Sequence, residues 1–69
     1  MKRPSVAELE LRIAEGKRLR AWREVRGVIR RELAADLDVS PYVVQSWESG
    51  VVRIPLDRRE QLRELGCEL

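Results

Sequence analysis

Residues 30–50, RRELAADLDVSPYVVQSWESG, contain the pattern that decides the fold. The first half places small and apolar side chains on one face of a short helix, because residues three and four apart are neighbours there. These side chains are Leu33, Ala34 and Leu37. Ser40 and Pro41 then form a helix start, since serine caps the first amides and proline at the first helical position leaves no amide hydrogen unpaired. The stretch therefore predicts two short helices, at about 30–37 and 41–48, joined by a tight turn.

The segment before this stretch also predicts helix. Ser5 and Glu8 have the form of a capping box, in which the serine accepts from a first-turn amide and the glutamate reaches back to the cap. Apolar side chains then recur near helical spacing up to Gly27, which is expected to end the helix. They are Val6, Leu9, Ile13, Leu19, Trp22 and Val25. Gly16 weakens a helix interior by about 1 kcal/mol and leaves two interpretations open. The segment is one helix or two, with the bounds 6–26, or 6–15 and 17–26.

The segment after this stretch predicts one more helix, capped by Asp57 and closed by Gly66. Its apolar residues are Leu56, Leu62 and Leu65. No alternating run typical of a strand occurs. We therefore expect an all-α fold, a bundle of four to five short helices, in one domain over residues 1–69. Its parts are an N-terminal helical extension, a core and a C-terminal helix, at 5–16, 17–56 and 57–66.

The composition argues against an enzyme or a metal protein. Histidine is absent and Cys67 is the only cysteine, so the usual zinc ligand sets and histidine-dependent nucleophiles cannot be assembled. We expect no catalytic residues, no metal site and no cofactor, and we interpret Cys67 as a reduced, incidental thiol. The chain has no apolar run long enough for a membrane span and no signal-peptide pattern, so we expect a soluble, cytoplasmic protein.

Positive charge is concentrated in one segment, although the formal net charge is only +2. Residues 17–31 contain seven cations and a single acid, Glu24. The charged residues of the next segment, 32–49, are all acids. The seven cations are Lys17, Arg18, Arg20, Arg23, Arg26, Arg30 and Arg31. Most cations of the chain are arginine, whose planar fork suits phosphate and guanine. Composition alone leaves two interpretations open, a solvated helix face or a nucleic-acid surface.

Two short helices joined by a tight turn, the second opening with Ser-Pro, form the pattern that presents a helix to the major groove of DNA. Small side chains at Ala34 and Ala35 are expected to allow a close crossing of these helices. The residues expected to fix that crossing by packing are Val39, Val44 and Trp47. The outward side of the second helix has groups that contact base edges well, since glutamine pairs with adenine and apolar groups contact the thymine methyl. We expect base contacts from Tyr42, Val43, Gln45 and Ser46.

Residues 17–56 resemble the phage-repressor/Cro family of helix-turn-helix domains, also called Xre-like. The resemblance rests on Leu19, Arg23, Glu24, Gly27, Glu32, Leu33, Ala34, Leu37, Val39, Ser40, Val44, Trp47, Glu48, Ser49, Gly50 and Pro55. It implies a lambda-repressor-like bundle, a sequence-specific transcriptional regulator of the repressor or autoregulator type, and an ion pair between Arg23 and Glu48. It also implies groove contacts from the helix that starts at Pro41, with Ser49 near a phosphate.

One position departs from the family pattern. Similar proteins commonly have a hydroxyl residue followed by glutamine at the start of the first of the two helices, where this chain has Ile29 and Arg30. The loss of the capping hydroxyl weakens the helix start, whereas arginine can bind the phosphate through a charge-assisted hydrogen bond. The residues that we expect to contact the DNA backbone are Arg30, Arg31, Ser40, Ser49, Arg53 and Lys17.

A module this small buries little surface on double-stranded DNA, so we expect it to bind a two-fold operator as a homodimer. The N-terminal extension has more apolar residues than one short core requires, namely Val6, Leu9, Leu11 and Ile13. They either pack on a second subunit, together with Leu65 and Leu69, or complete the core of the monomer. An alternative function is an antitoxin-like or other protein-interaction module that also binds DNA, with a toxin as its protein partner.

Overall fold

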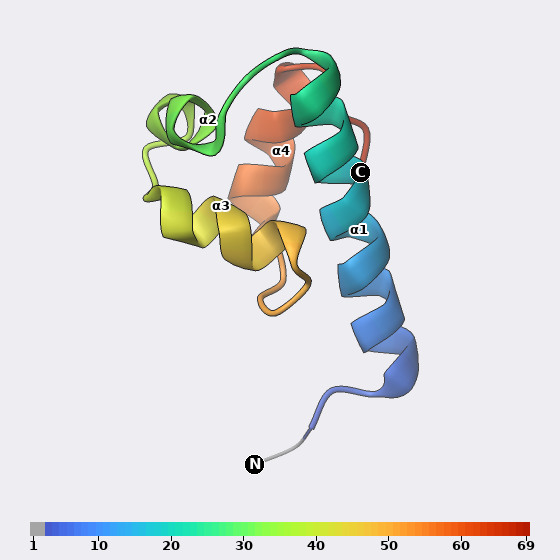
Figure 1. Ribbon diagram of the computed structural model, residues 1–69. Helices are drawn as coiled ribbons and strands as arrows, with labels where there is room; N and C mark the ends of the chain where they lie inside the picture. Colours follow the sequence, from blue (N-terminus) through green and yellow to red (C-terminus); the bar gives the residue numbers. More distant parts are fainter. Residues whose placement is uncertain (1–2) are drawn as a thin grey trace.

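The computed structural model describes residues 3–69, and within them it contains four helices and no strand. The helices are α1 (Val6–Val25), α2 (Arg30–Asp36), α3 (Pro41–Glu48) and α4 (Leu56–Glu64). The other three helices gather beside the C-terminal half of α1, while its N-terminal half extends past them (Figure 1). The expected all-α class is confirmed.

α1 is one continuous helix, so of the two interpretations the single helix is correct. Ser5 caps its start, because its Oγ accepts a hydrogen bond from the amide of Glu8 at 3.1 Å. The Glu8 carboxylate does not complete a capping box and instead accepts from Arg12 Nη2 at 2.9 Å, one helical turn further on. The N-terminal half of α1 is therefore stabilised by a cap and by a pair at helical spacing.

The close approach of α1 to α3 explains why a glycine lies in the middle of α1. A Cβ atom placed on Gly16 would lie 2.5 Å from the carbonyl oxygens of both Trp47 and Glu48. Only a residue without a side chain lets the backbone of α1 come this near to the last residues of α3. The propensity cost of Gly16 is thus compensated by a tertiary contact that the local sequence does not reveal.

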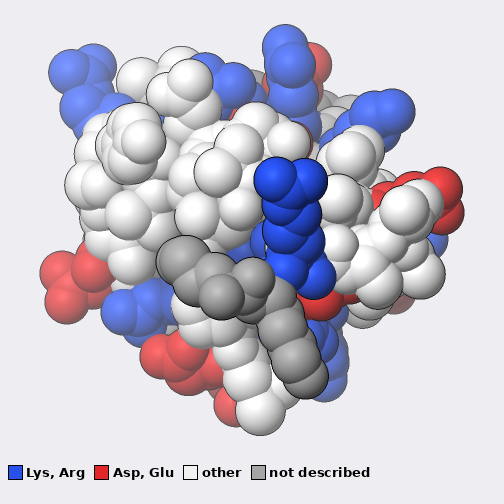
Figure 2. All heavy atoms as spheres, turned by 90° about the horizontal axis from the view of Figure 1, so that it is seen from below, with Lys and Arg blue, Asp and Glu red and all other residues white. Residues whose placement is uncertain are grey.

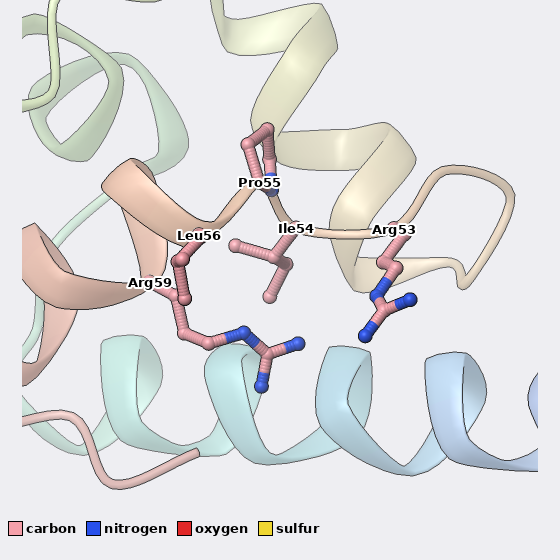
Figure 3. Close-up of a pocket in the computed structure, with 5 residues that line it drawn as sticks. All are labelled: Arg53, Ile54, Pro55, Leu56 and Arg59. Atoms are coloured by element: carbon pink, nitrogen blue, oxygen red, sulfur yellow. The ribbon is translucent and has the colours of Figure 1, made fainter.

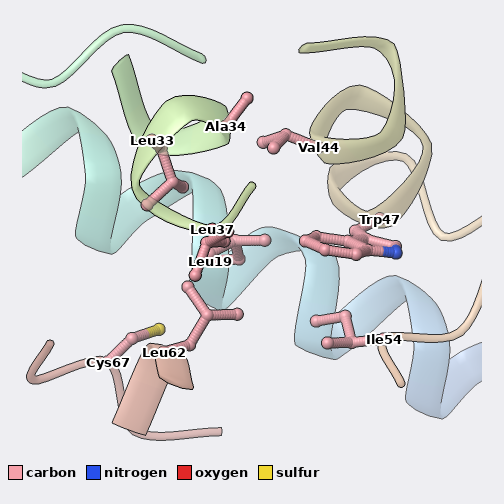
Figure 4. Close-up of a cluster of buried hydrophobic side chains, with 9 residues drawn as sticks. All are labelled: Leu19, Leu33, Ala34, Leu37, Val44, Trp47, Ile54, Leu62 and Cys67. Atoms are coloured by element: carbon pink, nitrogen blue, oxygen red, sulfur yellow. The ribbon is translucent and has the colours of Figure 1, made fainter. Parts of the chain in front are cut away.

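The core lies where the four helices meet (Figure 4). Its buried residues are Leu19, Leu33, Ala34, Leu37, Val44, Trp47, Ile54, Leu62 and Cys67. Cys67 is a free cysteine and is also part of the core packing, which the sequence interpretation did not include. Burial raises the pKa of the Cys67 thiol, because the thiolate would lose its hydration.

Three apolar or small residues expected to face inward lie at the surface instead. Val25 is 88% exposed, because it lies at the last turn of α1, where helical spacing continues beyond the packed face. Ala35 is exposed on α2, so of the two alanines only Ala34 lies in the core, where its small side chain allows the close crossing with α3. Leu56 is exposed at the first residue of α4, which begins after Pro55. Asp57 consequently lies in the first turn of α4 and is not its cap.

The turns around α3 match the sequence expectation closely. Ser40 accepts a hydrogen bond at Oγ from the amide of Val43 at 3.3 Å, and Pro41 is the first residue of the helix. Asp38, in the turn after α2, has a φ of 55°, a left-handed conformation that aspartate tolerates better than most residues. After α3, Gly50 has a φ of 79°, and a Cβ atom there would lie 2.9 Å from Ile13 Cγ1. Glycine at this position thus satisfies both a backbone conformation and a close contact with α1.

The apolar residues of the N-terminal extension do not complete the core of the monomer. Those expected to pack there are exposed, namely Val6, Leu9, Leu11 and Ile13. This corrects one of the two interpretations of the extension. Leu65 and Leu69, by contrast, are partly buried and pack against the core.

Candidate nucleic-acid interface

The outward side of α3 contains a shallow pocket of about 180 Å³. We call it the α3 pocket; its lining residues are Tyr42, Gln45, Ser46, Ser49 and Val51. The structure thus brings together three of the four residues expected to contact bases, along with one expected to contact phosphate. Val51 is an addition that sequence reasoning missed, because it lies in the connection after α3 and belongs to no helical pattern.

Val43 is the expected base-contacting residue that does not line the α3 pocket. It is half-buried and packs against the core, so its assignment to the solvent-facing side of α3 is only partly correct. The reason is its place beside Val44 and one turn before Trp47, both of which are buried. Ser46 is also half-buried, whereas Tyr42 and Gln45 are exposed.

The two serine hydroxyls of the α3 pocket donate to the backbone of their own helix. Ser46 Oγ donates to the carbonyl oxygen of Val43 at 2.7 Å, and Ser49 Oγ donates to that of Ser46 at 3.2 Å. A hydroxyl has one proton and two acceptor lone pairs. Both oxygens therefore remain available as acceptors, while their protons are already engaged.

The C-terminal end of α3 is held against α1 by the ion pair between Arg23 and Glu48, which the family resemblance implies. Arg23 Nε donates to Glu48 Oε2 at 2.7 Å, and Arg23 Nη2 donates to Glu48 Oε1 at 3.1 Å. The side chain of Glu48 is only 2% exposed. Its carboxylate raises the pKa of the Arg23 guanidinium, mainly through these hydrogen bonds. Arg23 also donates from Nη1 to the carbonyl oxygen of Val28 at 2.9 Å, which ties the chain after α1 to the same group.

A second arginine binds the same carboxylate. Arg30 Nε donates to Glu48 Oε1 at 2.9 Å from the first residue of α2. Glu48 therefore connects α1, α2 and α3. Arg30 was expected to contact a DNA phosphate, and among residues 3–69 its two terminal nitrogens donate to no group, so both remain free for that contact.

The other cations fall into two groups. Arg20 is paired with Glu24, lowering the pKa of that carboxylate, while Arg26 lies over the Trp22 ring and donates to the Leu65 carbonyl oxygen. The expected backbone-contacting residues Lys17, Arg31 and Arg53 are exposed and form no ion pair within residues 3–69. Figure 2, seen from below Figure 1, shows a largely uncharged surface with both Lys and Arg and Asp and Glu side chains around it.

A larger pocket of about 300 Å³ lies between the loop after α3 and the start of α4, facing α1 (Figure 3). Its lining residues are Arg53, Ile54, Pro55, Leu56 and Arg59. Arg59 Nη2 donates to Glu15 Oε1 at 2.8 Å, and Arg59 Nη1 donates to Glu15 Oε2. The buried Glu15 carboxylate raises the pKa of Arg59. Nothing in the local sequence around Glu15 signals this pair, which joins α1 to α4.

Within the described part of the chain, no group of three or more His, Cys, Asp or Glu side chains is arranged to bind a metal ion. No helix among residues 3–69 is both long and apolar enough to cross a membrane. The chain matches no protein-family model, no curated protein and no solved structure.

Proposed function

We propose that this protein is a sequence-specific DNA-binding transcriptional regulator of the repressor or autoregulator type. In this proposal α2 and α3 form a helix-turn-helix in a lambda-repressor-like bundle, and α3 enters the major groove. The observation that carries the proposal is the arrangement of α3. Its solvent-facing side is uncharged and rich in hydrogen-bonding groups. Its C-terminal end is held in place by Glu48, which accepts hydrogen bonds from two arginines.

The division between uncharged and basic residues supports specific binding over general attraction to phosphate. Base edges are recognised by hydrogen bonds and apolar contacts, and the α3 pocket supplies both kinds of group. Affinity then comes from cations outside α3, because phosphate contacts supply the salt-dependent part of binding. The candidates are Arg30, Arg31, Arg53 and Lys17, with the hydroxyls of Ser40 and Ser49 as neutral contacts.

We further propose that two copies bind a two-fold operator, in contact through the extension face, which we define as Val6, Leu9 and Ile13. These residues share one side of α1 and remain exposed. Ile13 also lies against Gly50, so the extension face adjoins the loop next to the α3 pocket. A second copy is the occupant we favour, because one module of this size buries too little DNA surface for tight binding.

Selection of bound sequences from random duplex DNA tests the regulator proposal. We expect one two-fold sequence motif to be enriched, and binding of that sequence to weaken steeply with salt. Gln45→Ala should relax the preference at one base position per half-site, while Arg63→Ala, in the last turn of α4 and outside the α3 pocket, should leave it unchanged. If no sequence is enriched, the proposal is wrong.

Sedimentation analysis tests the extension face. Leu9→Glu should shift the protein from dimer to monomer, because it places a charge on the proposed interface. Leu11→Glu is the matched control, because Leu11 is two positions after Leu9 and its side chain therefore points to nearly the opposite side of α1. Equal effects of the two substitutions, or a monomer for the unsubstituted chain with its operator, would contradict the proposed dimer.

A further inference from the structure

We infer that the α3 pocket binds an A·T base pair, accepting a hydrogen bond from the adenine amino group and enclosing the thymine methyl group, with Val51 as the residue that selects the methyl. This inference rests on the proposed function and adds to it the base pair and a residue outside the recognition helix.

The hydrogen bonds of the serines determine which base groups can bind beside them. Because the hydroxyl protons of Ser46 and Ser49 are donated to backbone carbonyls, their oxygens face the pocket as acceptors. In the major groove the exocyclic amino groups of adenine and cytosine are donors, whereas N7 and O6 of guanine and O4 of thymine are acceptors. The two serine oxygens therefore favour the amino group of adenine or cytosine at the position that they contact. No charged side chain lines the α3 pocket, so the usual arginine contact to guanine is not supplied there.

Val51 adds an apolar wall to the same pocket. Its side chain is 70% exposed, yet its position is set by the backbone, since the amide of Val51 donates to the carbonyl oxygen of Ser46 at 3.1 Å. The left-handed conformation of Gly50 makes this reversal of the chain. A valine fixed beside polar groups and left uncovered is suited to contact an apolar group of the ligand. In the major groove of unmodified DNA, that group is the thymine methyl.

The two requirements together identify one base pair. In the major groove A·T offers both a donor and a methyl group, with the thymine O4 acceptor between them, whereas G·C offers the cytosine amino group without a methyl. Gln45, also in the pocket, fits the same pair, because a glutamine amide can both donate to N7 of adenine and accept from its N6 amino group. Val51 thus separates A·T from G·C where the serine oxygens alone would accept either.

The experiment uses the sequence enriched from random duplex DNA and replaces each thymine in turn by deoxyuridine, which removes only the methyl group. We expect one thymine per half-site at which the replacement weakens binding about fourfold, the ratio that follows from one methyl leaving an apolar contact. Val51→Ala should bind the thymine and deoxyuridine duplexes equally. Val52→Ala is the matched control, because Val52 is the next residue, is also exposed and does not line the pocket, and it should keep the discrimination.

A second replacement tests the amino group at the same pair. Adenine is exchanged for 2-aminopurine, which still pairs with thymine but has no amino group in the major groove. We expect this exchange to weaken binding several-fold, with a smaller loss for Ser46→Ala than for the unsubstituted protein. An enriched sequence without any methyl-sensitive thymine, or equal discrimination in Val51→Ala and Val52→Ala, overturns this inference and leaves the proposed function intact. Failure to enrich any sequence overturns both.

Discussion

Glu48, the last residue of α3, accepts two hydrogen bonds from Arg23 of α1 across 25 positions of sequence. Both residues are buried, so the pair lies in an environment where water cannot replace either partner. Burial of a single unpaired charge costs several kcal/mol, whereas a pair with good geometry compensates most of that cost. Removal of either residue alone would leave the other charge buried without its partner in this pair, which strongly destabilises the fold. The orientation of α3 therefore depends on both residues of this pair.

The first prediction concerns that carboxylate. Glu48→Gln should lower the free energy of unfolding by about 3–5 kcal/mol, because it leaves the Arg23 charge buried without a counter-ion. Urea denaturation followed by tryptophan fluorescence measures the change. Glu24→Gln is the control, since Glu24 forms a surface pair with Arg20, and it should change stability by less than about 1 kcal/mol. Similar losses for the two substitutions would show that burial of the Arg23 pair is unimportant.

The second prediction separates helix propensity from tertiary contact at Gly16. On propensity alone, Gly16→Ala should stabilise α1 by about 1 kcal/mol. Because the added Cβ would lie 2.5 Å from two backbone carbonyl oxygens, we expect a net loss instead, of about 1–3 kcal/mol. Thermal and urea unfolding report the sign directly. Ala21→Gly, at an exposed position of the same helix, should cost about 1 kcal/mol through propensity. A Gly16→Ala protein more stable than the original would contradict the close approach of α1 and α3.

Local chemistry explains why some elements could be predicted from sequence. The bounds of α3 were predicted correctly because Ser40, Pro41 and Gly50 act on the backbone next to them. The continuity of α1 could not be predicted, since the reason for Gly16 is a contact with residues about thirty positions away. Val25 was misplaced for a related reason: helical spacing identifies a side of a helix but not where the packed core ends.

The ion pairs between helices were predicted less well than the helices themselves. The Arg23–Glu48 pair was expected only from the family resemblance, and the second bond, from Arg30 to Glu48, was not expected at all. Glu15 and Arg59 are 44 positions apart, so no pattern within either helix identifies them as partners. Hydrophobic periodicity has a fixed repeat along one helix, whereas an ion pair between helices depends on how those helices cross.

The third prediction concerns this pair between α1 and α4. Arg59→Met should destabilise the protein by about 3–5 kcal/mol, because it leaves the buried Glu15 carboxylate without its guanidinium partner. The double substitution Glu15→Met with Arg59→Met should recover most of that loss, since two methionines can bury the same volume without a charge. A double-mutant cycle measured by urea denaturation gives the coupling. Additive losses for the two single substitutions would contradict the interaction.

The fourth prediction concerns Arg30, which rests on the proposed function. Arg30 can donate from Nε to Glu48 while its terminal nitrogens reach a phosphate, and lysine cannot make both contacts. Arg30→Ala should therefore weaken binding to all sequences alike and lower the slope of log affinity against log salt by about one unit. Arg30→Lys should recover only part of the affinity. Arg63→Ala is the control, and loss of affinity confined to the selected sequence would contradict the assignment of Arg30 to the DNA backbone.

The fifth prediction is a pH dependence that originates at Cys67. Because burial raises the pKa of this thiol in the folded protein, the unfolded chain releases the proton first, at about pH 8.5. Above that pH the unfolded state binds fewer protons than the folded state, so stability falls as pH rises, by at most about 1.4 kcal/mol per pH unit, until the folded thiol also ionises. Below pH 8.5 this group contributes no pH dependence. Cys67→Ala should lower stability at pH 7.5 by opening a cavity in the core, but it should lack this alkaline decline. The measurement is the unfolding free energy of the unsubstituted protein and of Cys67→Ala in urea at pH 7.5, 9 and 10. The difference between the two values should shrink as pH rises. A constant difference would mean that the thiol is in contact with water.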